Sequence, residues 1–290
     1  MREYIITTDN NSDLPKAYYQ EAGVPCAALS YMMNDVMYDG LNRTQTDQEF
    51  YAAVRAGAMP VTQQVNPENS KALFEPYAKQ GLDILHLAFS SGLSGTYQSN
   101  CIAAEEIREE YPDCNIVVID TLCASMGQGF LVSEAVKRHK DGMSMQDLIA
   151  WVEANKLNIV HEVLADDLFH LQRGGRISKA AAVFGSALNV KPLIQVNNEG
   201  KLVSFGKQRG RNAGIAFLAN NLAKKIDVKQ CERVCISHSD CIEDVEKLMD
   251  LVREKTSVTD FTVSYIGPTI GAHTGAGTIA LFYFAANRDA

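Results

Sequence analysis

Three short runs of almost unbroken apolar residues constrain the fold of the N-terminal half more than any other feature. They lie at residues 4–8, 84–89 and 116–119, and helical patterns separate them. A strand covered by helices on both faces is apolar along its whole length, and strands that alternate with helices form parallel sheets. Residues 1–157 therefore predict a Rossmann-like α/β domain with a parallel sheet.

Residues 24–57 interrupt this alternation. They predict a β-hairpin with its turn at Asn34-Asp35, followed by a helix over 47–55. We interpret this segment as an excursion from the first domain. Helical patterns at 125–140 and 144–155 follow later, and the domain boundary is expected near residue 157.

Residues 158–290 follow a different order. Asn197-Asn198-Glu199-Gly200 joins two strand-like runs at 190–196 and 201–206, a pattern typical of a hairpin. Helices are predicted over 210–226 and 242–254, with further strands over 159–164, 233–237, 261–266 and 278–284. This half predicts an α+β domain whose sheet is mostly antiparallel.

The charge balance argues against a nucleic-acid coat protein. Lys and Arg number 27 against 35 Asp and Glu, a net charge of -8, whereas such proteins need a basic surface. The N-terminus lacks the basic region, long apolar region and cleavage site of a secretory signal. No apolar run approaches the roughly 18–20 residues that span a bilayer. We therefore expect a cytoplasmic protein.

The seven cysteines include no Cys-x-x-Cys pair. Zinc and redox sites commonly use that spacing, so the sequence predicts reduced, mostly buried thiols and no metal site.

The strongest polar signal follows the strand predicted at 84–89. Ser90-Ser91-Gly92-Leu93-Ser94-Gly95-Thr96 leads into a helical pattern. Ligands bind at the carboxyl ends of strands in open α/β sheets, and the free N–H groups of a helix start favour a carboxylate or phosphate. Alternatively, Ser94 or Thr96 only caps the helix. In a third interpretation Ser94 is the nucleophile of a serine hydrolase or acyl-transfer enzyme. The nucleophile turn of α/β-hydrolases also joins a strand to a helix, but its second glycine, two residues after the serine, is missing here.

Three further segments carry polar residues of unexplained purpose. Thr62 lies upstream of Asn66-Pro67, which predict the N-cap and first turn of a helix. His273 lies in a glycine-dense segment, 267–277, which predicts tight turns or a close approach of the backbone. Cations gather between 173 and 211, either as solvated ion pairs or as a site for phosphate or an acidic partner: Arg173, Arg176, Lys179, Lys191, Lys207, Arg209 and Arg211.

In their order along the chain, these segments resemble the DegV family. The resemblance covers nearly the whole chain, and the family's studied members are bacterial fatty-acid-binding proteins that serve as the FakB-type subunit of fatty acid kinase. It rests on Thr8-Asp9 with Asp13-Leu14-Pro15, on residues 90–99, on Asp120 with Ser125, Gly127 and Gly129, on 171–178, on Lys191-Pro192, on 207–211, and on Gly271-Ala272-His273 with Gly275 and Gly277.

The resemblance implies that a long-chain fatty acid such as palmitate lies in a tunnel between the two domains. Thr62 and Ser94 would hold its carboxylate, and the weaker candidates are Ser91, Gly95, Arg173 and His273. A separate fatty acid kinase would phosphorylate the carboxylate, so this chain itself would need neither catalytic residue nor cofactor.

Arg176, Lys207 and Arg209 are predicted to dock the kinase, and transient contact with a membrane surface is also expected. Binding of another small amphiphilic anion stays open as an alternative. So does the role of three apolar residues that either line the tunnel or belong to the ordinary core: Phe169, Phe184 and Leu188.

Two departures from the usual family pattern leave the geometry of the head group open. Asn10 takes the place of a serine, and Gln63-Gln64-Val65 replaces Ser-Gln-Pro after Thr62.

Overall fold

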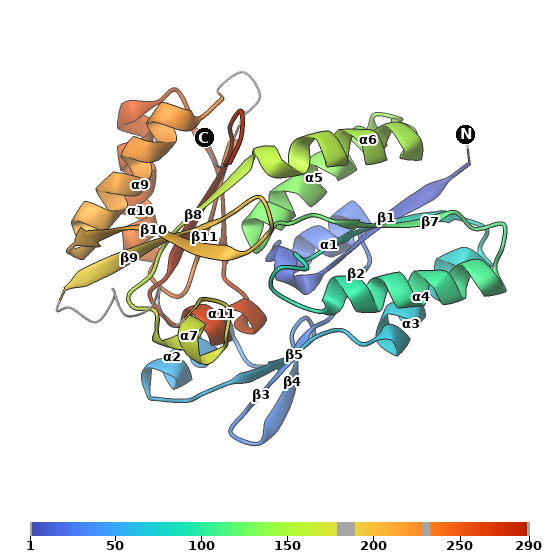
Figure 1. Cartoon of the computed structure of the whole chain (residues 1–290), viewed down its shortest axis with the longest axis horizontal. Helices are drawn as coiled ribbons and strands as arrows, with labels where there is room; N and C mark the ends of the chain where they lie inside the picture. Colours follow the sequence, from blue (N-terminus) through green and yellow to red (C-terminus); the bar gives the residue numbers. More distant parts are fainter. Residues whose placement is uncertain (1, 179–188, 228–232, 289–290) are drawn as a thin grey trace.

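The computed structural model describes residues 2–178, 189–227 and 233–288 (Figure 1). Its N-terminal half contains a parallel four-stranded sheet of order β2-β1-β6-β7. The strands are β1 (Tyr4–Asp9), β2 (Cys26–Ala27), β6 (Asp83–Ala88) and β7 (Ile116–Asp120). The predicted parallel sheet is confirmed.

Helices cover both faces of this sheet, which explains why its strands are apolar along their length. On one face Ile84 packs with Ile107, within a cluster contributed by α3 (Pro67–Lys79) and α4 (Thr96–Glu110). On the other face Leu85 and Leu87 belong to the largest core cluster. The helices on this side are α1 (Lys16–Ala22), α5 (Met126–Lys140) and α6 (Met145–Asn155).

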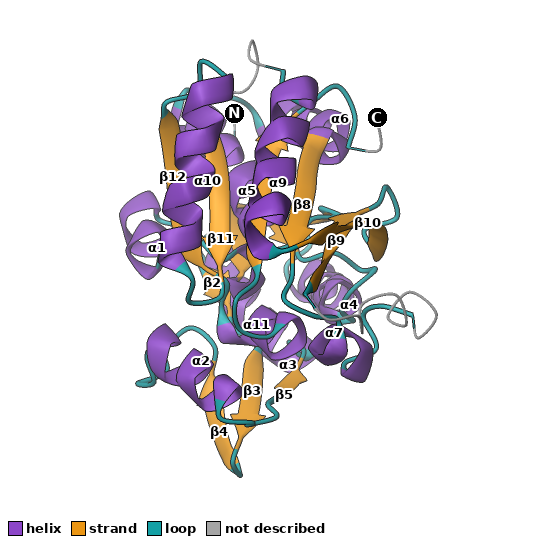
Figure 2. Ribbon diagram, turned by 90° about the vertical axis from the view of Figure 1, so that its left-hand side faces the viewer, coloured by secondary structure: helices purple, strands orange, loops and turns teal. Residues whose placement is uncertain are grey.

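The predicted excursion is present and longer than expected. The hairpin of β3 (Ser30–Met33) and β4 (Val36–Asp39) turns at Asn34 and Asp35, both with positive φ, and α2 (Asp47–Arg55) follows. A strand that the sequence did not predict, β5 (Val61–Gln63), pairs with β3. The excursion therefore ends at Gln63 and not at residue 57, and its three strands project from the body of the molecule (Figures 1 and 2).

The C-terminal half contains a six-stranded sheet of order β10-β9-β8-β13-β11-β12. All neighbouring pairs are antiparallel except β11 and β12, so the mostly antiparallel prediction is confirmed. Helices α9 (Arg211–Lys225) and α10 (Ile242–Lys255) cover one face (Figure 2). The strands are β8 (Ile159–Leu164), β9 (Val190–Val196), β10 (Leu202–Arg209), β11 (Arg233–His238), β12 (Asp260–Tyr265) and β13 (Ile279–Phe284).

Two short helices in this half were not predicted: α7 (Phe169–Arg173) and α11 (Pro268–Thr274). The glycine-dense segment was expected to contain tight turns or a close approach of the backbone; α11 occupies most of it, and a turn follows at residues 276–277. Proline at the first helical position suits a helix start, because its missing N–H has no intrahelical partner there. The expected close approach occurs at Gly271, where a Cβ would lie 2.4 Å from the Tyr51 hydroxyl.

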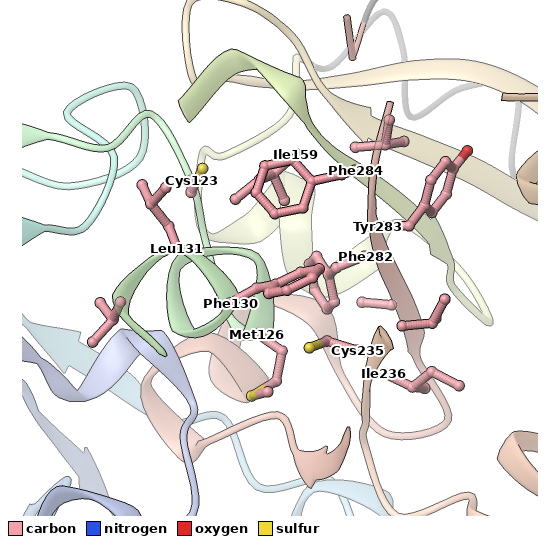
Figure 3. Packing of buried hydrophobic residues seen from close by; sticks show 14 of the residues in the cluster. Cys123, Met126, Phe130, Leu131, Ile159, Cys235, Ile236, Phe282, Tyr283 and Phe284 are labelled. Carbon is pink, nitrogen blue, oxygen red and sulfur yellow. The ribbon is translucent and has the colours of Figure 1, made fainter. Parts of the chain in front are cut away.

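The two halves share one continuous core. Figure 3 shows Met126 and Phe130 of α5 facing side chains of β11 and β13, and the rings of Phe130 and Phe284 lie 5.0 Å apart. The boundary expected near residue 157 falls in the short 3-10 turn η2 (Lys156–Asn158), between α6 and β8. Helix α5 packs against both sheets and joins the two halves.

Candidate functional site

A cavity of about 410 Å³ lies between the two domains. Its size falls within the range of roughly 300–1,000 Å³ that is usual for small-molecule pockets. The N-terminal half contributes β5, the loop after β6 and the turn before α5, and the C-terminal half contributes the remaining walls. The apolar lining residues are Leu29, Phe89, Leu93, Ala124, Val163, Leu171, Ile194, Val196, Leu202, Ile266, Ile270, Ala280 and Phe282.

Thr62 and Ser94 line this same cavity, although they are distant in sequence. Thr62 lies on β5, where pairing with β3 sets it opposite Tyr31, and its neighbours Val61 and Gln63 are exposed. Ser94 follows the carboxyl end of β6. Both residues are partly exposed, whereas Ile194 and Phe282 in the wall are buried. We therefore place the opening of the cavity at the two hydroxyls.

The hydrogen bonds of Ser94 support a positional role for this residue. Its Oγ lies 3.0 Å from Thr96 Oγ1 and accepts the Thr96 N–H at 3.2 Å. The N-cap of α4 is Gly95, which has no side chain to offer, so Ser94 satisfies part of the helix start. Ser94 thus caps the helix through one hydrogen bond, the one from the Thr96 N–H. The same residue also lines the cavity.

The guanidinium of Arg176 also lines the cavity. Its Nε donates to Leu93 O at 3.1 Å and its Nη1 to Gly174 O at 2.6 Å. Burial lowers the pKa of Arg176, yet no carboxylate pairs with it within the described part of the chain. A partly buried cation without a counter-charge favours an anionic ligand. Arg176 was predicted to dock a partner, and the structure places it in the cavity wall.

His273 completes this group, which we call the head-group cluster: Thr62, Ser94, Arg176 and His273. His273 Nε2 lies 2.9 Å from Thr62 Oγ1, and its buried Nδ1 has no partner among residues 2–178, 189–227 and 233–288. The pKa of His273 is lowered to about 4, chiefly by burial and to a smaller extent by the nearby Arg176, Arg173 and His170. The imidazole is therefore neutral near pH 7 and orients the Thr62 hydroxyl without adding charge.

The other weaker candidates lie outside the wall of the cavity. Ser91 is exposed, and its N–H donates to Asp120 at 3.1 Å. Gly95 faces Gln64, whose Oε1 would lie 2.4 Å from a Cβ at this position, so glycine allows the two loops to approach. Arg173 donates to Pro60 O at 3.0 Å and to Ala272 O at 3.2 Å, so it links α7 to the residue before β5 and to α11.

The predicted basic segment divides into two groups. Lys191 and Arg211 pair with Asp166, and Arg211 also pairs with Asp244. Lys207 and Arg209 are exposed on β10, an edge strand of the larger sheet.

Several apolar and basic candidates do not help to define the cavity. Phe169 is 51% exposed and is not part of the wall. Lys179, Phe184 and Leu188 lie outside the described residues.

Sequence reasoning missed a set of buried polar residues in the same wall. They come from five separate segments, and none lies in a motif with a recognisable ligand spacing. The available signals were a histidine within the apolar run 159–164 and the place of Ser125 among the residues that carry the family resemblance. The residues are Asn11, Ser125, His161, Thr269 and Thr278.

The geometry gives the hydrolase alternative no general base. In the described part of the chain Ser94 Oγ bonds only to Thr96, and His273 Nε2 is engaged by Thr62. A nucleophilic serine needs a base within about 2.6–3.2 Å.

A survey of the described residues found no group of three or more His, Cys, Asp or Glu able to hold a metal ion. The six cysteines among them are free thiols. No helix there combines the length and apolar character needed to cross a bilayer.

Comparison with known proteins identifies the family. The family model described as "Uncharacterised protein, DegV family" matches residues 4–286. A DegV domain-containing protein of Clostridium perfringens is 43% identical over 100% of both chains. This chain belongs to the DegV family. The predicted resemblance is confirmed.

Solved DegV structures share the two-domain fold. A DegV family protein from Thermus thermophilus, described by its fatty acid binding, is 28% identical with a TM-score of 0.85, over 98% of this chain and 100% of that one. DegV of Bacillus subtilis, described as a fatty acid binding protein, is 27% identical with a TM-score of 0.84, over 98% and 100%. The predicted fold class is confirmed.

The two departures from the usual DegV pattern have structural roles. Asn10 accepts the Leu29 N–H at 2.8 Å and donates to Leu29 O at 3.4 Å, which holds the chain beside the cavity. After Thr62, Gln64 Nε2 donates to Ser99 Oγ at 3.2 Å, and the Val65 N–H donates to Thr96 Oγ1 at 3.4 Å. The Thr96 hydroxyl therefore links the Ser94 loop to the Thr62 segment.

Proposed function

We propose that this chain binds a long-chain fatty acid in the interdomain cavity and presents its carboxylate to a separate kinase. The acyl chain lies against the apolar wall, and Thr62, Ser94 and Arg176 hold the carboxylate. The observation that carries the proposal is the Arg176 guanidinium, which has no carboxylate partner among the described residues and lines the largely apolar cavity together with two hydroxyl residues. The fatty acid binding described for the relatives from Thermus thermophilus and Bacillus subtilis supports it.

The energetics of an acyl chain favour this arrangement. Burial of a 16-carbon chain moves about 15 carbons out of water at roughly 0.8 kcal/mol each, or about 12 kcal/mol before ordering costs. Burial of the carboxylate without a partner would cost several kcal/mol. The acid is therefore most stable with its tail inside and its head at the partly exposed head-group cluster.

Arg176 supplies the counter-charge for this carboxylate. A guanidinium forms short, charge-assisted hydrogen bonds with carboxylate oxygens, which are about twice as strong as neutral ones. The Thr62 hydroxyl, held by neutral His273, donates a further bond. Arg176 therefore has a role in ligand binding that the sequence analysis had not given it.

Presentation to a kinase is consistent with a head-group cluster that can hold a carboxylate but, within the described part of the chain, offers Ser94 no general base for attack on it. Thr62 and Ser94 are partly exposed, so a partner can reach the carboxylate, and Ser94 has no base among the described residues. Lys207 and Arg209, exposed on β10, are the proposed docking residues. The handover would take place in the bacterial cytoplasm, and transient contact with a membrane surface would supply the acid.

The lipid content of the purified protein tests the binding proposal. Protein purified from its host is denatured, and the released lipid is identified and quantified by mass spectrometry. About one fatty acid per chain, palmitate or a close relative, is expected. Absence of lipid, together with failure to take up added palmitate, would refute the proposal.

A further inference from the structure

The cavity wall contains buried polar side chains that a carboxylate at the head-group cluster does not use. Asn11, Ser125, His161, Thr269 and Thr278 line the cavity and are each at most 4% exposed. A pocket for a plain hydrocarbon tail has apolar walls, because a buried polar group without a partner costs free energy. This polar stretch therefore requires an explanation of its own.

Four of these side chains are satisfied within the protein. Ser125 Oγ donates to Asp13, and Thr278 Oγ1 donates to Thr274 O at 3.0 Å. His161 Nε2 accepts the Ala124 N–H at 3.2 Å, and its Nδ1 lies 2.9 Å from Ile159 O. Thr269 Oγ1 donates to Asn11 Oδ1 at 2.6 Å. None of the four needs a ligand.

Asn11 is the exception. Its backbone N–H donates to Asp9 Oδ1 and its Oδ1 accepts from Thr269, but its Nδ2 forms no hydrogen bond within the described part of the chain. If the amide were turned over, Nδ2 would meet Thr269 and Oδ1 would be left without a donor. In either orientation, one polar atom of a side chain that is only 2% exposed has no protein partner at the cavity.

Helix α11 places Asn11 relative to the head-group cluster. Thr269, which holds Asn11, and His273, which holds Thr62, are four residues apart on this helix. At 1.5 Å per residue their positions differ by about 6 Å along the axis. A fatty acid with its carboxylate at Thr62 would therefore pass Asn11 with the half of its chain nearer the carboxyl group.

We propose that Asn11 selects for an oxygen on the acyl chain, so that the cavity prefers a hydroxy fatty acid to the unsubstituted acid of equal length. A hydroxyl both donates and accepts, and it can therefore pair with the Asn11 amide in either orientation. An unsubstituted chain leaves that amide unpaired, which is how a site built for a hydroxyl discriminates against the analogue that lacks it. The inference rests on the proposed function and defines its ligand more narrowly.

Binding of matched acids to the full-length protein tests this selection. After removal of endogenous lipid, dissociation constants are measured by calorimetry for hexadecanoic acid and a positional series of hydroxyhexadecanoic acids. At least one isomer with its hydroxyl nearer the carboxyl group is expected to bind about two- to tenfold more tightly than hexadecanoic acid, the worth of one hydrogen bond.

Two variants assign the preference to Asn11. The double variant Asn11→Leu with Thr269→Val removes both partners of one hydrogen bond, and it is expected to bind hexadecanoic acid at least as tightly as the wild type and to lose the preference. Thr278→Val is the matched control, because it deletes a wall hydroxyl that already bonds to Thr274. This control is expected to keep the preference.

Several outcomes would overturn the inference. Equal wild-type affinity for hexadecanoic acid and for every isomer would mean that Asn11 is satisfied by water alone, and this comparison needs no variant to fold. A preference that persists in the double variant would assign the selection to another residue. If the wild type bound none of the acids, the proposed function itself would fail.

Discussion

Arg176 and His273 lie close together at the cavity but differ in charge. Burial lowers the pKa of both, yet an arginine starts from a value so high that it stays protonated, whereas His273 falls to about 4. The head-group cluster therefore carries one positive charge near pH 7. One positive charge neutralises a carboxylate but only half of the charge of a phosphate dianion. Of the two anions that the sequence predicted for the Ser94 loop, the carboxylate is therefore favoured.

The two hydroxyls provide a direct mutational prediction. Thr62→Ala and Ser94→Ala should each weaken palmitate binding by about 1–3 kcal/mol, because each removes a bond to a charged group. Calorimetry on lipid-free protein measures the change, and circular dichroism checks the fold. Ser91→Ala is the matched control, since Ser91 lies on the same loop outside the cavity wall, and its affinity should be unchanged. Wild-type affinity in both test variants would reject the carboxylate assignment.

Asp13 provides a prediction about pH. The pKa of Asp13 is raised to about 8, chiefly by burial. Hydrogen bonds from Ser125 and Gly267 oppose this increase, and the charges of Asp47 and Asp9 add a smaller increase. Because the folded pKa exceeds the unfolded value of 3.8, Asp13 binds its proton more tightly when folded. Proton binding by Asp13 therefore adds to the free energy of unfolding. This contribution is complete below about pH 4 and is lost as pH rises through 8.

Thermal melts of Asp13→Asn should show this contribution. The wild-type melting temperature should decrease relative to that of the variant as pH rises from 5 to 8.5, since asparagine does not titrate. The exposed Asp113→Asn serves as control and should follow the wild type. Parallel pH profiles for wild type and Asp13→Asn would contradict the raised pKa.

At the scale of elements, the sequence pattern predicted the long helices and strands and the β3–β4 hairpin, but it missed strand β5 and helices α7 and α11. Strand β5 has three residues and helix α11 has seven, too few for a repeat to be visible, and isolated helices of that length are marginal in water. Both are stabilised by packing against distant parts of the chain. Thr62 lies on β5 and His273 on α11, so periodicity did not bring these two residues together, and only the family resemblance made them candidates.

The candidate site was predictable only where a motif marks it. The Ser94 loop follows a strong apolar run, and residue order linked Thr62 to the family. Asn11, Ser125 and His161 come from segments more than 30 residues apart, and only the folded chain brings them to one wall. Arg176 was predicted to dock a partner, and only the folded chain shows that it lines the cavity without a carboxylate partner among the described residues.

The contact between α7 and α11 depends on a glycine. A Cβ at Gly174 would lie 2.1 Å from His273 Nδ1, so Gly174→Ala should displace the imidazole from Thr62 and weaken palmitate binding about tenfold. A double-mutant cycle with His273→Ala checks the cause: in that background Gly174→Ala should cost little. An equal loss in both backgrounds would show that the effect does not act through His273.

For the molecule as a whole, the cavity lies between domains that share one core. Helix α5 packs on both sheets, so the cavity walls and the exposed edge strand β10 belong to one body. A partner that docks on β10 would therefore stand in a fixed position relative to the head-group cluster. Lipid binding and docking should be separable by mutation.

Arg209→Ala tests that separation. The variant should retain its bound fatty acid, because Arg209 is exposed on β10 and absent from the cavity wall, and should be a poorer substrate carrier for a fatty acid kinase. Bound lipid is quantified by mass spectrometry, and acyl phosphate formation is followed with kinase and ATP. Lys201→Ala, on the exposed turn before β10, is the control. Equal loss of lipid and of phosphorylation would argue against docking through Arg209.

A crystal structure with 16-bromohexadecanoic acid tests the central claim most directly, because anomalous scattering from bromine locates the tail independently of the head. The account predicts a bromine peak within the apolar wall near Ile194 and Phe282, and carboxylate oxygens within hydrogen-bonding distance of Thr62, Ser94 and Arg176. Bromine outside the interdomain cavity, or a carboxylate in the interior with the tail at Thr62, would contradict it.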